Sequence, residues 1–295
     1  MGIFKEEKEA PLYRTLMFVP GNQQRRLDKV KSLQSDAVIL DLEDSVPLHE
    51  KESARSLVRQ TLLGQHAEQV CFVRINDITT PFLVDDLESV VVSSLRGIML
   101  PKADGRDSIF LADYLLTHFE RKNGIDPGKL EIIPLIESAS GVQHSYEIAS
   151  ACKRVKRLAF GSVDYALDVR AELTDEGTET LLARSQLVVA SRSAGIEPPI
   201  DAVYFHINDT QGLSKSAEFA KKLGYQGKLV VHPNQIETVH QAFTPSEEEI
   251  EQAERIVQAF AEAQRSGLAA IQLDGKMIDI PVVERAKKMT KFRKS

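Results

Sequence analysis

The feature that most constrains the fold is a repeated alternation of short apolar segments with longer segments of helical period. Apolar runs typical of buried strands, each bounded by turn residues, occur at 15–19, 37–42, 70–75, 97–100, 131–136, 158–160, 202–205 and 229–231. The segments between them place apolar residues three and four apart, and two of these segments end in Gly195 and Gly224. This alternation predicts an α/β fold, a (β/α)8 TIM barrel.

A doubly wound open sheet is the alternative fold with the same alternation. Such a sheet carries a glycine-rich fingerprint after its first strand, whereas this chain has VPGNQQ there, with the single glycine Gly21. With 295 residues and 42% hydrophobic residues, the chain can bury a core large enough for one barrel. The barrel is therefore favoured.

The pattern changes after the last predicted strand. Residues 246–265 are predicted to form a capped helix, followed by the hairpin turn Asp274-Gly275 and a helix that Pro281 can begin. The C-terminal part therefore packs on its own barrel or on a neighbouring subunit. We expect three parts, namely an N-terminal extension (1–13), the barrel (14–244) and a C-terminal extension of helices and a hairpin (245–295).

Composition limits the partners and the compartment. The net charge of -6 argues against general binding to nucleic acid or anionic membranes, and no apolar run approaches the roughly 18 residues of a membrane span. The first residues, MGIFKEEKEAP, lack the apolar core of a signal peptide. Cys71 and Cys152 fit neither a metal spacing nor a disulfide framework. We expect a cytoplasmic protein that binds no nucleic acid and no membrane.

Polar residues follow almost every predicted strand. In barrels of this kind, catalytic groups lie just after the C-terminal ends of the strands. A purely structural barrel would not need carboxylate, guanidinium and imidazole groups converging on one face. The segments concerned are PGN, EDS, RIND, PKAD, IESASG, GSVDY, HIND and HPNQ.

Two of these strand ends predict a metal site. Glu137 follows IIPLI and Asp164 follows LAFGSV, so neighbouring strands bring both carboxylates within reach of one ion. Ligands that are all oxygen favour a hard cation, Mg²⁺ before Mn²⁺. The alternative is that Glu137 caps a helix starting at Ser138 and that Asp164 begins a turn.

Glu43 and Asp44 bring further carboxylates to the end of an apolar strand, where unpaired charges are costly to bury. We expect both to hold water molecules bound to the metal, which makes Glu43 a candidate catalytic residue and Asp44 a candidate substrate-binding residue. For Asp44, an N-cap of a helix beginning near Pro47 is an equally good interpretation.

Basic residues suit an anionic substrate. Arg74 ends a strand, where its guanidinium can bind a carboxylate or an oxygen next to a thioester, the alternative being an ion pair with a carboxylate of the barrel mouth. Arg25 and Lys29 are predicted on one helix face beside a glycine turn, which suits a phosphate-bearing substrate. A solvated basic face explains these two residues equally well.

Lys102, His206 and His232 also follow predicted strands. A lysine at that position can form a Schiff base, but we favour a salt bridge to an acidic neighbour. Either histidine can orient a substrate, and the seven histidines form no metal triad.

A series of motifs resembles one family of carbon–carbon lyases. RTLMFVPGN, DAVILDLEDSVPLHEKESAR, FVRIND, LPKAD, PLIESASGV, FGSVDYALD and LDGKMIDIPVVERA occur in order between about residues 14 and 289. Together they resemble the citrate lyase beta subunit-like family. The resemblance implies a TIM-type barrel, a homotrimer and Mg²⁺-dependent cleavage or formation of β-hydroxyacyl thioesters.

The resemblance also implies roles for individual residues. Glu137 and Asp164 match the metal ligands, Arg74 a substrate-binding arginine, and Arg25 and Lys29 the basic residues for the phosphates of CoA. Asp279 matches an acid that family lyases donate from the tail of an adjacent subunit, and its alternative role is a cap before the final helix.

Two positions depart from the family pattern. Val163 stands where many relatives have an acid, and Phe18 stands where some have a tyrosine near the substrate.

VVHPNQI, which contains His232, favours a free acyl-CoA substrate over a thioester on acyl carrier protein. We expect citramalyl-CoA, cleaved to acetyl-CoA and pyruvate, with malyl-CoA, citryl thioesters and a Schiff-base aldolase using Lys102 as alternatives.

Overall fold

The structure, a computed structural model, describes residues 11–64, 69–265 and 267–290. Eight parallel strands pair in chain order and close on themselves, β1 with β8, which confirms the predicted (β/α)8 barrel. Their bounds are β1 Thr15–Pro20, β2 Ala37–Asp41, β3 Cys71–Arg74, β4 Gly97–Leu100, β5 Glu131–Ile136, β6 Ala159–Phe160, β7 Ile200–Asp201 and β8 Gly227–Val230.

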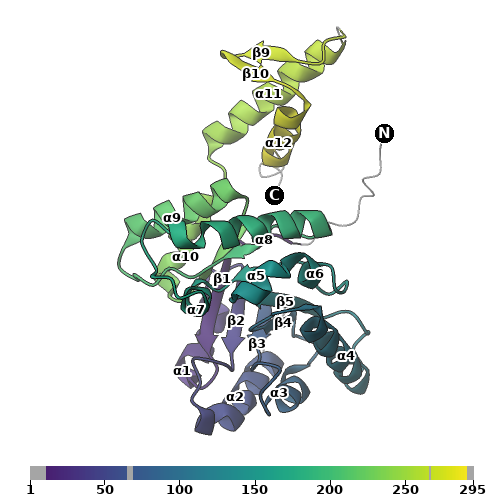
Figure 1. Cartoon of the computed structure of the whole chain (residues 1–295), viewed down its shortest axis with the longest axis vertical. Helices are drawn as coiled ribbons and strands as arrows, with labels where there is room; N and C mark the ends of the chain where they lie inside the picture. The colour runs from purple at the N-terminus through teal and green to yellow at the C-terminus, as the bar shows by residue number, and fades with distance from the viewer. Residues whose placement is uncertain (1–10, 65–68, 266, 291–295) are drawn as a thin grey trace. The chain divides into compact units, whose positions relative to one another are not determined.

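Helices follow the strands and cover the outside of the barrel (Figure 1). Gly195 and Gly224 end two of them with φ of 72° and 110°, which confirms both predicted caps. The bounds are α1 Gln24–Leu27, α2 Lys51–Leu63, α3 Leu83–Val90, α4 Arg106–Lys122, α5 Ala139–Gln143, α6 Ser145–Ala149, α7 Ser162–Asp168, α8 Leu181–Ala194, α9 Thr210–Leu223 and α10 Ile236–Phe243, with short 3-10 helices η1 Val30–Ser32, η2 Leu48–Glu50, η3 Thr178–Thr180 and η4 Pro233–Gln235.

The barrel interior is filled by side chains and is not a pore. Because helices cover the outer face, the strands are buried on both sides and most of their residues are apolar. All five residues of β2 are buried, for example. The interior cluster contains Leu16, Ile39, Phe72, Met99, Ile133 and Leu229, among others.

One strand lies earlier than the sequence predicted. Instead of the apolar run 202–205, the ladder with β6 and β8 uses Ile200 and Asp201. Val203 and Phe205 lie beyond the ladder and line a cavity at the barrel mouth. The prediction was wrong because apolar residues that line a cavity and apolar residues in a buried strand look alike in sequence.

The chain divides into two compact units, Met1–His240 and Gln241–Ser295, so the division falls inside α10 and before the predicted boundary at residue 244. Most of the predicted N-terminal extension lies outside the described residues, but Tyr13 belongs to the barrel interior. Among the described residues, no helix combines the length and apolar character required to cross a membrane.

The second unit has its own small core of Phe260, Ile278 and Val283. Ser246 caps α11 reciprocally with Glu249, as the sequence predicted. The predicted hairpin turn at Asp274-Gly275 is present, and both residues have the positive φ that such a turn requires. The elements are α11 Glu247–Arg265, β9 Ile271–Leu273, β10 Lys276–Ile278 and α12 Ile280–Thr290.

Candidate active site at the barrel mouth

The site begins with a pair of opposite charges on adjacent strands. Asp41 ends β2 and is in register with Arg74, the last residue of β3. The Arg74 Nε and Nη2 groups donate to the two oxygens of Asp41, each at 2.7 Å. Burial alone would raise the pKa of Asp41, but Arg74 and the hydrogen bonds from Ser45 and Glu43 lower it. Asp41 is therefore a fixed anion that orients Arg74.

Arg74 also lies near the two carboxylates that follow β2. Its Nη1 is 3.1 Å from Glu43 Oε2 and 3.4 Å from Asp44 Oδ2, and its guanidinium lies 4.8 Å from the centre of the Phe18 ring. The ion pair considered in the sequence analysis is thus present. The same guanidinium lines the mouth cavity, so the ion pair and a substrate contact are compatible.

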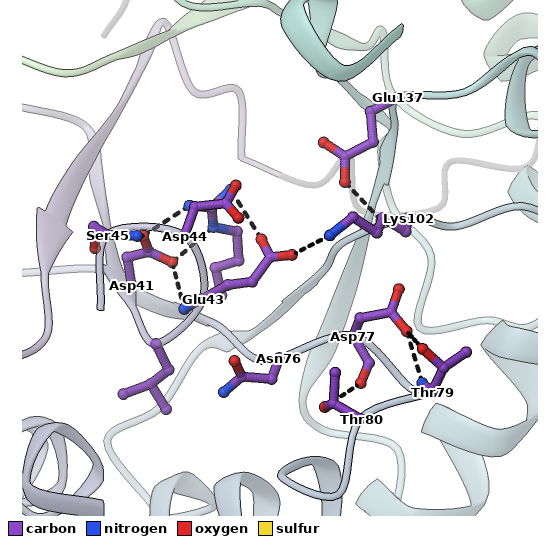
Figure 2. A network of polar contacts seen from close by, with 12 residues as sticks. Asp41, Glu43, Asp44, Ser45, Asn76, Asp77, Thr79, Thr80, Lys102 and Glu137 are labelled. Carbon is purple, nitrogen blue, oxygen red and sulfur yellow. Dashed lines mark hydrogen bonds and ion pairs between the residues drawn. The ribbon is translucent and has the colours of Figure 1, made fainter. Parts of the chain in front are cut away.

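The turn between β2 and α2 is held from beneath by two buried side chains. Asp41 accepts the backbone N–H groups of Glu43 and Ser45 at 3.0 and 3.1 Å, as Figure 2 shows. The Lys51 ammonium donates to the carbonyl oxygens of Leu42 and Glu43 at 2.6 and 2.7 Å. These bonds fix the backbone from which the side chains of Glu43 and Asp44 project.

A chain of contacts joins Glu43 to Glu137 through Lys102 (Figure 2). Lys102 Nζ donates to Glu43 Oε1 at 2.9 Å, and the Lys102 backbone N–H donates to Glu137 Oε1 at 2.8 Å. The favoured salt bridge of Lys102 is thereby confirmed. Lys102 adopts a φ of 49°, a left-handed conformation that is costly for a lysine and persists where the surroundings enforce it.

Glu137 is the most perturbed acid of the mouth. Burial, together with the nearby charges of Glu43 and Asp164, raises its pKa to about 8, although the hydrogen bond from Lys102 opposes the change. Burial and the charge of Asp44 also raise the pKa of Glu43, against the effect of Arg74. Burial thus disfavours the ionised form of both acids more than the nearby cations of the protein favour it.

Glu137, Asp164, Asp44 and Arg74 line one cavity of about 440 Å³. Its charged side comes from the ends of β2, β3, β5 and the first turn of α7. Its other side is apolar and is formed by Phe18, Leu135, Phe160, Val203, Phe205, Leu229 and Val231. The cavity can therefore hold a molecule with an anionic, oxygen-rich end and an apolar portion.

The donor set fits a magnesium ion. Among the described residues, no three acidic, histidine or cysteine side chains converge in a ready-made metal cage. Mg²⁺ does not require one, because it binds one or two carboxylates and completes its shell with water or substrate oxygens. Gly161 keeps the space beside the Glu137 carboxylate open, because a Cβ at this position would lie 2.6 Å from Glu137 Oε2. Glu137 and Asp164 are thus the residues that could hold Mg²⁺.

The caps considered for Glu137 and Asp44 are not formed. Ser138, not Glu137, caps α5 by accepting the N–H of Gly141 at 2.9 Å. Asp164 lies in the first turn of α7, with its neighbour Val163 also lining the cavity. The residue before η2, Pro47, has no side-chain cap, so Asp44 does not cap that helix.

The predicted phosphate-binding residues lie at the surface. Arg25 and Lys29 are exposed, but α1 ends at Leu27, so the prediction that both lie on one helix was wrong. The chain passes from a single α-helical turn into η1, which places Lys29 before that second helix. Neither residue lines the mouth cavity, whereas Arg26 between them does.

Other strand-end residues have local roles. His232 Nδ1 accepts the N–H of Asn234 at 3.2 Å and caps η4, while its neighbour Val231 lines the cavity. Asp77 accepts both the N–H and the hydroxyl of Thr79 at 2.6 Å, which closes its own turn (Figure 2).

The sequence predicted the HIND segment directly after a strand at 202–205, and this prediction was wrong. Because β7 ends at Asp201, His206 and Asp209 are not strand-end residues. The Asp209 carboxylate caps α9 through the N–H of Gly212, and the exposed His206 lies 3.8 Å from Asp175.

Asp279 belongs to the second unit, where it precedes α12. Its Oδ1 accepts the N–H of Val282 at 3.3 Å, which is the cap considered as its alternative role. The carboxylate is half-buried.

Sequence reasoning assigned no role to Asp41, Lys51 or Arg26. For Asp41 a signal existed, because an aspartate that ends an apolar strand requires a partner, and Arg74 ends the next strand. Lys51 carried no comparable signal, since a lysine at the start of a helix is ordinarily solvated.

Comparisons with known proteins give the family. Residues 14–233 match the model of the HpcH/HpaI aldolase/citrate lyase family, and residues 200–290 match a family of carbon–carbon bond lyases of the TIM-barrel fold. The chain belongs to the HpcH/HpaI aldolase/citrate lyase family. This membership makes it a carbon–carbon lyase and confirms the resemblance on which the sequence analysis relied.

Two kinds of family member are similar over most of their length. The citrate lyase subunit beta of Haemophilus influenzae is 37% identical, covering 96% of this chain and 98% of that protein. The mitochondrial citramalyl-CoA lyase of Homo sapiens is 31% identical, covering 92% of this chain and 83% of that protein.

A solved structure matches most of the chain. The protein CitE of Mycobacterium tuberculosis, in complex with magnesium, acetoacetate and coenzyme A, superposes with a TM-score of 0.80 and 28% identity. The match covers 96% of this chain and 99% of that one. Another CitE structure, with magnesium and pyruvate, has a TM-score of 0.71 and 26% identity.

Proposed function

We propose that the chain is a Mg²⁺-dependent lyase that cleaves the carbon–carbon bond of a β-hydroxyacyl-CoA thioester, with citramalyl-CoA converted to acetyl-CoA and pyruvate. The observation that carries the proposal is the mouth cavity, in which Glu137, Asp164 and Arg74 face an apolar wall. Magnesium, a small oxo acid and coenzyme A are bound together in the similar CitE structure, which supports the same class of ligands here.

The chemistry requires that a hydroxyl proton leave, that a carbon–carbon bond break and that its electron pair move into a thioester enolate. Bound Mg²⁺ would polarise oxygens of the keto-acid half. Arg74, oriented by Asp41, offsets the negative charge on those oxygens, a contribution of about 3 kcal/mol for a well-placed donor. Among the described residues, Glu43 Oε2 forms an ion pair with Arg74 but accepts no hydrogen bond, which makes Glu43 the candidate to receive the hydroxyl proton through an ordered water.

Asp279 completes the proton transfers in this proposal. Its carboxyl group protonates the acetyl enolate in the cleavage direction and removes the methyl proton in the condensation direction. We propose that it reaches a mouth from an adjacent subunit of a homotrimer. Light scattering of the purified protein tests the trimer directly, since a monomer would leave the mouth without that acid.

The variant Asp279→Asn separates proton transfer from metal binding. Its kcat should fall by about 10²-fold or more, which is typical of a lost general acid, while the Kd for Mg²⁺ stays unchanged. Unchanged turnover would remove Asp279 from the mechanism.

The apolar wall favours a substrate with a methyl group at the carbinol carbon. Citramalyl-CoA releases pyruvate, which carries one carboxylate and one methyl group, whereas a citryl thioester releases oxaloacetate with two carboxylates. A second carboxylate would add charge to a mouth that already holds Asp41, Glu43, Asp44, Glu137 and Asp164. Malyl-CoA, which releases glyoxylate, remains the next candidate among free CoA esters.

A second candidate function is that of a citrate lyase beta subunit, which would act on a citryl thioester carried by acyl carrier protein. It is favoured by one observation, the higher identity to citrate lyase beta subunits, 37% compared with 31% to citramalyl-CoA lyase.

A Schiff-base aldolase using Lys102 receives no support from the geometry. Burial opposes protonation of Lys102, but its hydrogen bond and ion pair with Glu43 prevail and raise its pKa. A Schiff base requires a neutral amine, so this lysine is in the wrong protonation state for nucleophilic attack.

The remaining parts of the proposal concern binding and compartment. We place the phosphates of CoA near Arg25 and Lys29, and we place His232, whose neighbour Val231 lines the cavity, beside the substrate. The cytoplasm is the compartment that suits the free thiols Cys71 and Cys152.

The decisive experiment is a panel of purified protein with Mg²⁺ and citramalyl-CoA, malyl-CoA or citryl-CoA, assayed for released keto acid with and without EDTA. Release of pyruvate from citramalyl-CoA that EDTA abolishes is the expected result. No release from any free ester, with release from citryl-acyl carrier protein, would instead establish the beta-subunit function.

A further inference from the structure

Lys51 is a buried cation at an unusual place. It is the first residue of α2, the residue is only 6% exposed, and its ammonium contacts the carbonyl oxygens of Leu42 and Glu43. Among the described residues, its contacts include no direct ion pair with a carboxylate. A buried ammonium whose partners are two backbone carbonyls constrains those carbonyls strongly, because losing either bond leaves a desolvated charge.

Helix stability does not explain this lysine. A cation in the first turn of a helix faces the positive end of the helix dipole, which is unfavourable. The anions that act on its charge are Asp41, Glu43 and Asp44 of the mouth, together with Asp86 of α3. The position of the ammonium therefore serves the β2–α2 turn more than the helix that carries it.

The turn is held at both the N–H and the carbonyl oxygen of Glu43. Asp41 accepts the N–H of Glu43, and Lys51 donates to the carbonyl oxygen of the same residue. The backbone of Glu43 is thus fixed at donor and acceptor, which leaves mainly side-chain rotation. That side chain meets Lys102 Nζ at 2.9 Å and Arg74 Nη1 at 3.1 Å.

We propose that Lys51 is a positioning residue for the lyase reaction, which acts by fixing the backbone that directs Glu43 and Asp44 toward Arg74 and Lys102. The inference rests on the proposed function. Lys51 itself does not line the mouth cavity, whereas Asp44 and Arg74 do, so its effect reaches the substrate through them.

The test uses Lys51→Met with Lys51→Arg as the charge-retaining variant. The matched control is Lys122→Met, which removes a lysine whose ion pair with Glu88 lies at the surface. Two properties are measured: steady-state turnover on the best ester of the panel, corrected for the folded fraction, and hydrogen exchange of the amides of Glu43 and Ser45.

For Lys51→Met we expect kcat to fall about 10- to 100-fold with KM within about threefold, because the reacting groups are displaced while the cavity remains. The amides of Glu43 and Ser45 should exchange at least about tenfold faster, since the turn loses one of its two anchors. Lys51→Arg should recover part of kcat, and Lys122→Met should match the wild type in both measurements.

A folded Lys51→Met variant with wild-type kcat and wild-type exchange would overturn the proposal, as would a loss of kcat explained by the folded fraction alone. If Lys51→Met does not fold, Lys51→Arg decides by the same two readouts, because the guanidinium keeps the charge but changes the donor geometry. If the wild type cleaves no ester, the proposed function fails separately, and the exchange measurement alone decides whether Lys51 holds the turn.

Discussion

Two buried charge clusters in the same barrel differ in how completely they are neutralised. In the outer cluster, Arg154 donates to both oxygens of Glu120 at 2.7 and 2.6 Å and also pairs with Asp113. The Glu120 carboxylate further accepts the N–H groups of Gly128 and Leu130. Burial alone would raise the pKa of Glu120, but these bonds lower it. This cluster is complete without any ligand.

The mouth cluster is incomplete by the same standard. Glu137 receives one backbone hydrogen bond from Lys102, and its pKa is raised to about 8. The cations Arg74 and Lys102 are already shared among other acids. The contrast teaches that buried charge alone does not mark a functional site; an excess of one sign beside a cavity does.

The largest expected effect comes from Glu137→Gln. If the excess charge serves the metal, removing it should reduce kcat by about 10³-fold, corresponding to the several kcal/mol that a catalytic metal contributes. Stability should not fall, because an acid with a raised pKa destabilises the metal-free fold as pH rises from 4.5 toward 8. Turnover measurements with Mg²⁺ give kcat, and thermal unfolding without Mg²⁺ gives the stability. A fall in Tm with normal turnover would mean that Glu137 stabilises the fold and does not serve catalysis.

Arg154→Met should show the opposite pattern. It leaves Glu120 buried without its main counter-charge, so the free energy of unfolding at pH 7 should fall by about 3 to 5 kcal/mol. The lowered pKa of Glu120 implies that the cluster stabilises above the usual pKa and loses this effect as pH falls. Urea unfolding at pH 7 and pH 4 checks both statements, while turnover per folded molecule stays at the wild-type value. A specific loss of turnover would assign the outer cluster a role in catalysis.

The affinity for Mg²⁺ should depend on pH. Because burial and neighbouring acids raise the pKa of Glu137 to about 8, the metal must displace a proton at neutral pH. The apparent Kd should therefore tighten by up to about tenfold per pH unit between pH 6 and 8, then level off. Calorimetric titration at several pH values tests this, and a Kd constant over that range would contradict it.

The smallest effect is expected for Phe18→Leu. The Phe18 ring lies beneath the guanidinium of Arg74, a contact typically worth about 1 kcal/mol. KM should rise about fivefold with kcat little changed, since Asp41 still orients Arg74. The reverse result, a fall in kcat with constant KM, would show that the ring matters for the transition state.

The fold could be predicted because its determinants are local. Buried parallel strands are mostly apolar, and each turn and helix end carries its own residue preferences, as at Gly195 and in the Asp274-Gly275 hairpin. The seventh strand could not be located from the sequence, because the apolar residues Val203 and Phe205 line a cavity and do not pair in the sheet.

The site was only partly predictable. That Glu137 and Asp164 follow neighbouring strands could be predicted from the sequence, and the structure brings both to one cavity. The network around them depends on register and backbone conformation, such as the pairing of Asp41 with Arg74 and the left-handed φ of Lys102. The sequence signals that Asp41 requires a partner, but the register that supplies Arg74 and the conformation of Lys102 arise from the packing of distant segments.

The central claim is that the excess negative charge of the mouth is a magnesium site formed by Glu137 and Asp164. Calorimetric titration of Mg²⁺ at pH 7.5 tests it most directly, with the wild type, Glu137→Gln and the control Asp77→Asn, whose carboxylate faces its own turn. We predict one site in the wild type and in the control, and at least about tenfold weaker binding in Glu137→Gln. Equal binding by Glu137→Gln and the wild type would contradict the account.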